Sequence, residues 1–155
     1  MKRLRHPETE RNFPEPVPPS APAFRRRPSA GALVLVVDDY PDTRELLTLG
    51  LREAGFRVAE ASDGRMALER AWTLGPDLIL MDLSMPVLDG GAATLVLKSD
   101  PRSKHIPVVA VTCHDLDELG ETTRRIPFDA VVRKPCLPED VAELVVRLLD
   151  DLKSA

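Results

Sequence analysis

The 155-residue sequence is poor in cysteine and aromatic residues and has no long apolar run. Its two cysteines, Cys113 and Cys136, are too few for a disulfide framework and lack metal-ligand spacing, so we expect two small, partly buried thiols. The three histidines are scattered and predict no metal site. No stretch approaches the roughly 18–20 apolar residues of a membrane span, and the basic start lacks a signal peptide's apolar core. These absences favour a cytoplasmic protein that does not enter a membrane.

The net charge of −4 hides an asymmetry along the chain. Residues 1–30 hold seven Lys or Arg and three Asp or Glu, which gives +4, whereas the remainder holds 14 basic and 22 acidic residues, which gives −8. Nucleic-acid phosphates attract positive surfaces, so an acidic domain is a poor candidate for binding them. We therefore expect no direct nucleic-acid contact.

Proline density divides the chain into two parts. The first 30 residues contain seven of the fifteen prolines and end in Arg25-Arg26-Arg27 before Pro28. Proline removes backbone donors and fixes φ, which disfavours a packed structure. We predict a disordered Pro/Arg-rich tail over residues 1–31 and one folded domain over residues 32–152.

Apolar runs alternate with amphipathic segments throughout the second part. LVLVV (33–37) and DLILM (77–81) are typical of parallel strands buried on both faces. Further strands are predicted at 57–61, 107–111 and 129–133, and helices at 41–54, 63–74, 90–98, 115–125 and 138–152. The last helix carries one apolar face: Val141, Leu144, Val145, Leu148 and Leu152. Five strands alternating with five helices predict an α/β fold with a doubly wound parallel sheet.

Polar residues follow four of the predicted strands. Asp38-Asp39 follow the first strand, Asp82 the third, Thr112 the fourth and Lys134 the fifth. Ligands of such sheets bind beyond the carboxyl ends of the strands, so these side chains are expected to form one site. Three clustered carboxylates require a compensating charge, and an all-oxygen cluster suits Mg²⁺. With a lysine and a hydroxyl nearby, the set fits phosphoryl transfer, which depends on positioning and charge stabilisation.

Four segments carry a family resemblance: VLVVDDYPDTRELL (34–47), DLILMDLSMPVLDGG (77–91), IPVVAVTC (106–113) and DAVVRKPC (129–136). The sequence resembles the receiver domain of two-component response regulators over about residues 32–152. The resemblance implies a flavodoxin-like fold with strand order 2-1-3-4-5, which the residues alone do not give.

The resemblance also implies a role for each strand-end residue. Asp82 matches the phosphoacceptor, and Asp38, Asp39, Asp82 and the backbone carbonyl of Ser84 match the Mg²⁺ ligands. Thr112 and Lys134 match the switch hydroxyl and the phosphoryl-binding lysine. It further suggests a cis Lys134–Pro135 bond, which an X–Pro pair permits.

The sequence departs from the family pattern at three positions. Val131 replaces a frequent Tyr or Phe, while Ser84 and His114 occupy positions that flank the path of the hydrolytic water. His114 is either an exposed loop histidine or, with Ser84, a residue that tunes dephosphorylation. The tight loop after the acceptor is expected at Asp89-Gly90, where glycine would relieve backbone strain.

These features predict a single-domain response regulator without an output domain, and not an enzyme in the usual sense. Asp82 would accept a phosphoryl group from a histidine kinase or phosphotransfer protein, and the altered surface would signal to a downstream protein. One alternative is a binding module that works without phosphorylation. Another is a haloacid-dehalogenase-like phosphatase, whose D-x-D pattern differs from Asp38-Asp39-Tyr40.

Overall fold

A five-stranded parallel sheet forms the centre of the computed structural model, which describes residues 14, 31–85, 87–115 and 117–155. The strand order is β2-β1-β3-β4-β5, as the resemblance implied. The strands are β1 (Leu33–Val37), β2 (Arg57–Ala61), β3 (Leu78–Asp82), β4 (Val108–Thr112) and β5 (Ala130–Arg133). The predicted tail, residues 1–31, lies almost wholly outside the described residues.

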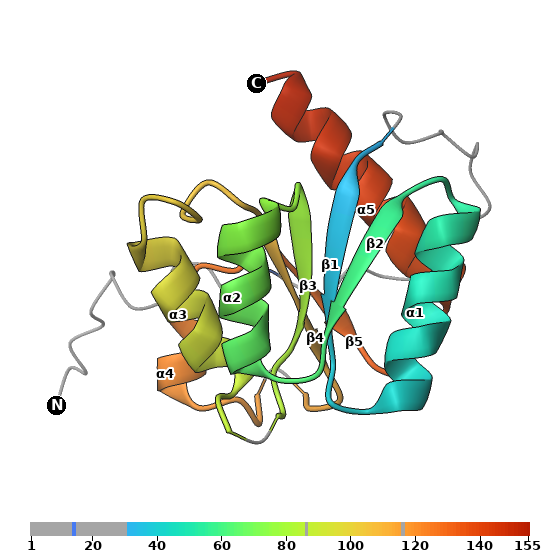
Figure 1. Ribbon diagram of the computed structural model, residues 1–155. Helices are drawn as coiled ribbons and strands as arrows, with labels where there is room; N and C mark the ends of the chain where they lie inside the picture. Colours follow the sequence, from blue (N-terminus) through green and yellow to red (C-terminus); the bar gives the residue numbers. More distant parts are fainter. Residues whose placement is uncertain (1–13, 15–30, 86, 116) are drawn as a thin grey trace, which may run out of the picture.

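Helices cover both faces of the sheet (Figure 1). They are α1 (Pro41–Glu53), α2 (Gly64–Leu74), α3 (Gly90–Ser99), α4 (Glu121–Arg124) and α5 (Pro138–Lys153). Helices α1 and α5 lie on one face, and α2, α3 and α4 on the other. Alternate residues of the central strands therefore enter two apolar cores. Val34 and Val36 pack with α1 and α5, whereas Leu35 and Val37 pack with α2 and α3.

The predicted helix over 115–125 is largely wrong, because among the described residues of this range only 121–124 are helical. The preceding segment turns instead, with the Glu118 N–H bonded to the Asp115 carbonyl at 2.9 Å. Gly120 precedes the helix and Pro127 follows it, and both residue types disfavour a longer helix. The loop after β4 therefore reaches farther than the apolar pattern indicated.

Two smaller sequence predictions also need correction. Leu152 was expected on the buried face of α5, but it is 53% exposed because the last turn extends past the sheet. Cys113 is exposed rather than partly buried, while Cys136 is partly buried as expected. Both thiols are free.

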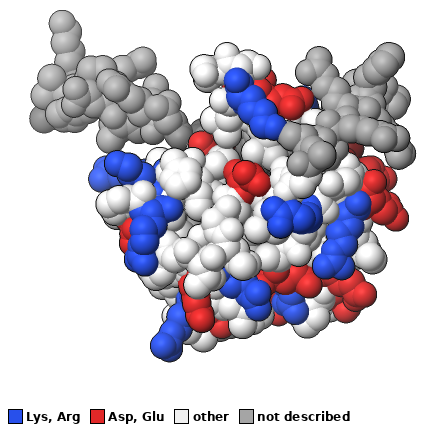
Figure 2. All heavy atoms as spheres, turned by 45° about the horizontal axis from the view of Figure 1, so that its top comes forward, with Lys and Arg blue, Asp and Glu red and all other residues white. Residues whose placement is uncertain are grey.

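Charges of both signs are interspersed on the face that comes forward when the top of Figure 1 is tilted toward the viewer (Figure 2). No large area of one sign is visible among the described residues of that view. In the described part of the chain, no helix combines the length and apolar character needed to cross a bilayer.

Candidate functional site

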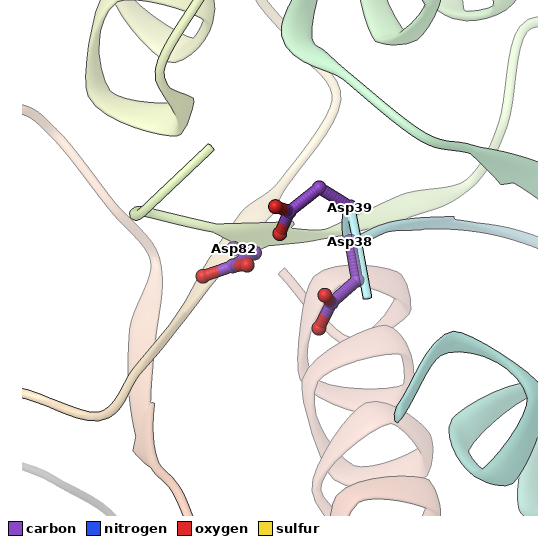
Figure 3. Close-up of side chains that lie close together, drawn as sticks. All are labelled: Asp38, Asp39 and Asp82. Carbon is purple, nitrogen blue, oxygen red and sulfur yellow. The ribbon is translucent and has the colours of Figure 1, made fainter. Parts of the chain in front are cut away.

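Three carboxylates meet at the carboxyl edge of the sheet (Figure 3). Asp38 and Asp39 follow β1, and Asp82 is the last residue of the adjacent strand β3. One oxygen of each lies within 4.8 Å of the others. Asp38 and Asp82 are buried, at 1% and 5% exposure, whereas Asp39 is exposed. The cluster therefore opens to solvent on the Asp39 side.

Lys134 places a positive charge beside the two buried carboxylates. It follows β5, and its Nζ lies 2.7 Å from Asp38 Oδ2 and 3.6 Å from Asp82 Oδ2. The Lys134 N–H also donates to the Thr112 carbonyl at 2.7 Å, which continues the β4–β5 ladder beyond the strands. The Lys134–Pro135 bond is cis, as the resemblance suggested.

The surroundings of Asp82 favour its protonated form when no cation is present. Burial raises its pKa, and the negative charges of Asp38 and Asp39 raise it further. The Ser84 N–H and Lys134 act in the opposite direction, and the pKa settles at about 6, compared with 3.8 for an ordinary aspartate. Burial, with a smaller contribution from the two neighbouring carboxylates, thus outweighs the Ser84 N–H and Lys134.

The same network keeps Lys134 charged. Burial by itself lowers the pKa of Lys134, but the hydrogen bond to Asp38 and the charges of Asp82 and Asp38 outweigh burial and raise it. Lys134 is therefore a fixed cation of the site.

The remaining predicted residues border the cluster. The Ser84 N–H donates to Asp82 Oδ1 at 3.1 Å, and Ser84 itself is exposed. Thr112, the buried last residue of β4, accepts a hydrogen bond on Oγ1 from the His114 N–H at 3.1 Å. The His114 side chain is half exposed, and its Nδ1 lies 3.5 Å from Glu118 Oε2. It is thus an exposed loop histidine.

Gly90 is required for a different reason from the one predicted. Its φ is not positive; a Cβ at this position would lie only 1.9 Å from the Asp82 carbonyl oxygen. Asp89 is the N-cap of α3, since its Oδ1 accepts the Ala92 N–H at 2.8 Å. The positive φ in this loop belongs to Val87, at 70°. Close packing therefore explains the glycine, and the backbone strain lies elsewhere.

Sequence reasoning missed Arg44 in α1. Its Nη1 donates to the Asp38 carbonyl at 2.7 Å, and its Nε lies 3.4 Å from Glu60 Oε1 on β2. The sequence signal is weak, because an arginine in the first turns of a helix is usually solvated.

The molecule is a doubly wound α/β domain with an acidic cluster at the carboxyl edge of its sheet, and comparison with known proteins identifies the family. The sequence profile of the response regulator receiver domain matches residues 34–146. The chain belongs to this family, whose members are signalling domains of two-component systems. With the family established, the phosphatase alternative is not supported.

Individual relatives agree with this membership. The chain is 43% identical over 84 residues to the response regulator PleD of Caulobacter vibrioides, a match that covers 54% of this chain and 18% of PleD. The chemotaxis protein CheY4 of Vibrio cholerae superposes with a TM-score of 0.70 at 30% identity, over 76% of this chain and 98% of CheY4.

The receiver domain of the sensor histidine kinase PA1611 from Pseudomonas aeruginosa superposes with a TM-score of 0.73 at 29% identity, over 78% of this chain and 99% of that one. That structure holds a magnesium ion in its active-site cleft. Receiver domains thus occur alone, in longer regulators and in kinases, and the match to PleD spans less than a fifth of its length.

Proposed function

We propose that this chain is a receiver that takes a phosphoryl group from a phosphohistidine donor onto Asp82. The donor would be a histidine kinase or a phosphotransfer protein. The observation that carries the proposal is the position of Asp82: a buried carboxylate at a strand end, 3.6 Å from a lysine ammonium and grouped with two further carboxylates.

In the proposed step, a carboxylate oxygen of Asp82 attacks phosphorus. A P–O bond forms and the P–N bond of the donor breaks, so that its electron pair returns to the imidazole. The Ser84 N–H holds the other carboxylate oxygen and so directs the nucleophile. Lys134 faces the charge that develops on the phosphoryl oxygens, and the Thr112 hydroxyl lies on the neighbouring strand to hydrogen-bond one of them.

The acidic cluster fits a hard divalent cation. Its three carboxylates are oxygen donors with ligand atoms within 4.8 Å of one another, and burial and the two neighbouring carboxylates raise the pKa of Asp82 although Lys134 lies close by. Asp38, Asp39, Asp82 and the Ser84 carbonyl would hold Mg²⁺, as the family resemblance implies. The bound ion would offset negative charge on the carboxylates and on the phosphoryl oxygens. The magnesium-containing PA1611 receiver domain supports this choice.

The phosphorylated surface would then be read by another protein. Thr112 is the last residue of β4 and its hydroxyl accepts the N–H of His114 in the loop that follows, so a change at this hydroxyl would reach exposed residues directly. Ser84 and His114 border the acceptor and would tune the lifetime of the phosphoryl group. We infer that the chain acts in the cytoplasm, where histidine kinases present their phosphohistidine.

Acetyl phosphate labelling with Mg²⁺ tests the acceptor. Wild type is expected to gain one phosphoryl group by mass spectrometry, and Asp82→Asn none, because an amide is not a competent nucleophile. Asp151→Asn makes the same change at an exposed end of α5 and should label normally. Full labelling of Asp82→Asn would refute the assignment.

A Mg²⁺ titration tests the cation site separately. Asp39→Ala removes a direct ligand and should weaken binding at least tenfold with little loss of stability, because Asp39 is exposed. A titration curve that overlays wild type would remove Asp39 from the site.

A further inference from the structure

Arg44 links three elements beside the acidic cluster. It lies in the second turn of α1, where its own N–H bonds the Tyr40 carbonyl at 3.1 Å. Its guanidinium reaches back to the Asp38 carbonyl at the end of β1 and to Glu60 on β2. The side chain is only 20% exposed, so this cation is partly withdrawn from water at a position next to the carboxylates.

Every polar group of Asp38 has a partner. Its N–H donates to the Ala61 carbonyl at 3.1 Å, and its carbonyl accepts from Arg44 at 2.7 Å. Its carboxylate accepts from the Tyr40 N–H at 2.9 Å and from Lys134 at 2.7 Å. The residue is thus fixed at both ends of its backbone as well as at its side chain.

The carbonyl contact matters most for the next residue. The Asp38 carbonyl belongs to the planar peptide unit that leads into Asp39, so its direction sets where the Asp39 backbone points. Asp39 is exposed, and the described residues give its carboxylate no hydrogen-bond partner. Its orientation toward the cluster therefore depends on the backbone.

We propose that Arg44 is a positioning residue for the cation site, which acts by holding the Asp38–Asp39 peptide so that Asp39 faces Asp82. This inference rests on the proposed function, since it concerns the same cation. A guanidinium suits the task because one of its N–H groups donates to the carbonyl while its Nε lies beside Glu60 in an ion pair, whereas an ammonium offers a single point charge.

Mg²⁺ affinity, measured by isothermal titration calorimetry well below the melting temperature, tests the proposal. Arg44→Met keeps the aliphatic stem and removes the donors, and we expect the Kd to rise about tenfold, the effect of losing one charged hydrogen bond. Arg44→Lys should give an intermediate Kd. Amide NMR signals of residues 38–40 should broaden or shift in Arg44→Met without added metal.

Arg102→Met is the matched control. Arg102 is also ion-paired, to Asp100 at 2.7 Å, and lies over the Trp72 ring at 4.3 Å, but it precedes β4 at the opposite edge of the sheet. Its loss should lower the melting temperature and leave the Mg²⁺ Kd unchanged, as for any purely structural arginine.

The results distinguish failure of the positioning role of Arg44 from failure of the proposed cation site. If Arg44→Met lowers the melting temperature but binds Mg²⁺ like wild type, while Asp39→Ala loses affinity, the positioning role is overturned and the cation site stands. Full recovery in Arg44→Lys would show that any cationic donor at this position suffices, which overturns the assignment of the guanidinium fork as the positioning group. If wild type binds no Mg²⁺, or Asp39→Ala binds it unchanged, the proposed cation site fails and the inference fails with it.

Discussion

Replacing Asp82 by asparagine should stabilise the metal-free protein at neutral pH. The folded protein raises the pKa of Asp82 from 3.8 to about 6, chiefly by burial. Each unit corresponds to about 1.36 kcal/mol, so ionising this carboxyl opposes folding by at most about 3 kcal/mol. Asparagine has a similar shape and carries no charge. The pKa of about 6 already includes the attraction to Lys134, and a buried asparagine amide still loses contact with water, so we expect a net gain of about 1–2 kcal/mol.

The difference in stability between Asp82→Asn and wild type should grow as the pH rises. Below pH 4, Asp82 is protonated in both the folded and the unfolded state, and the substitution removes no charge repulsion. As the pH rises from about 4 to 6, the unfolded chain loses the proton first, so wild type loses stability relative to the variant. Above about pH 6.5 the difference should be constant.

Urea unfolding in EDTA between pH 4 and 8 measures this difference. The single tryptophan, Trp72, contacts Ser103 and Arg102 far from the site and reports global unfolding. Asp151→Asn serves as the control for a carboxyl-to-amide change in solvent. A stability difference that is the same at pH 4 and pH 7.5, or an Asn variant less stable at pH 7.5, would refute the reasoning.

Two further substitutions test details of the fold. Thr48 on α1 is 3% exposed, and its Oγ1 has no hydrogen-bond partner among the described residues. Thr48→Val should therefore raise the free energy of unfolding, measured by urea denaturation, by about 1 kcal/mol. A lower free energy of unfolding in the variant would show that the hydroxyl does have a hydrogen-bond partner. Val87 is 82% exposed and has a φ of 70°, which strains a β-branched residue. Val87→Gly should therefore raise the free energy of unfolding by about 1 kcal/mol, after allowance for the greater conformational entropy of glycine in the unfolded chain. An unchanged urea midpoint would show that Val87 is not strained.

The strands and the site could be predicted because each rests on local sequence. Central strands such as 33–37 are apolar at every position, which only a sheet covered on both faces explains. Parallel strands then place their carboxyl ends along one edge of the sheet, so Asp38, Asp82 and Lys134 could be expected on that edge, while how close they come depends on the strand order. The order itself depends on long-range packing and came only from the family resemblance.

Other features depend on contacts that no local pattern contains. Gly90 is needed because a Cβ at this position would collide with the Asp82 carbonyl oxygen, and this close approach is a result of tertiary packing. Arg44 donates to the backbone carbonyl of Asp38, six residues earlier. Every residue has such a carbonyl, so the sequence does not indicate which one an arginine will contact. The helix after β4 was overestimated because its polar residues, Asp115 and Glu118 among them, bond within a turn and with Arg133 instead.

Phosphorylation should change mainly the loop after β4. The Thr112 hydroxyl accepts from the His114 N–H at 3.1 Å, so turning it toward a phosphoryl oxygen withdraws the acceptor that anchors this loop. Val131 is fully buried in the core beside α2 and α3 and is β-branched, so it has few rotamers to exchange and no aromatic ring to swing.

The described residues of the loop between Thr112 and α4 form no helix, so this loop offers little resistance to movement. The Arg133–Asp115 ion pair joins the loop to the end of β5. A phosphoryl group shifts a two-state equilibrium only through contacts that differ between the states, and here the contacts that differ lie in the loop. Backbone NMR with and without beryllofluoride should therefore show its largest changes at residues 112–120. Large changes confined to β5 around Val131, with the loop undisturbed, would contradict this mechanism, and Thr112→Val should abolish the loop response while leaving Mg²⁺ binding intact.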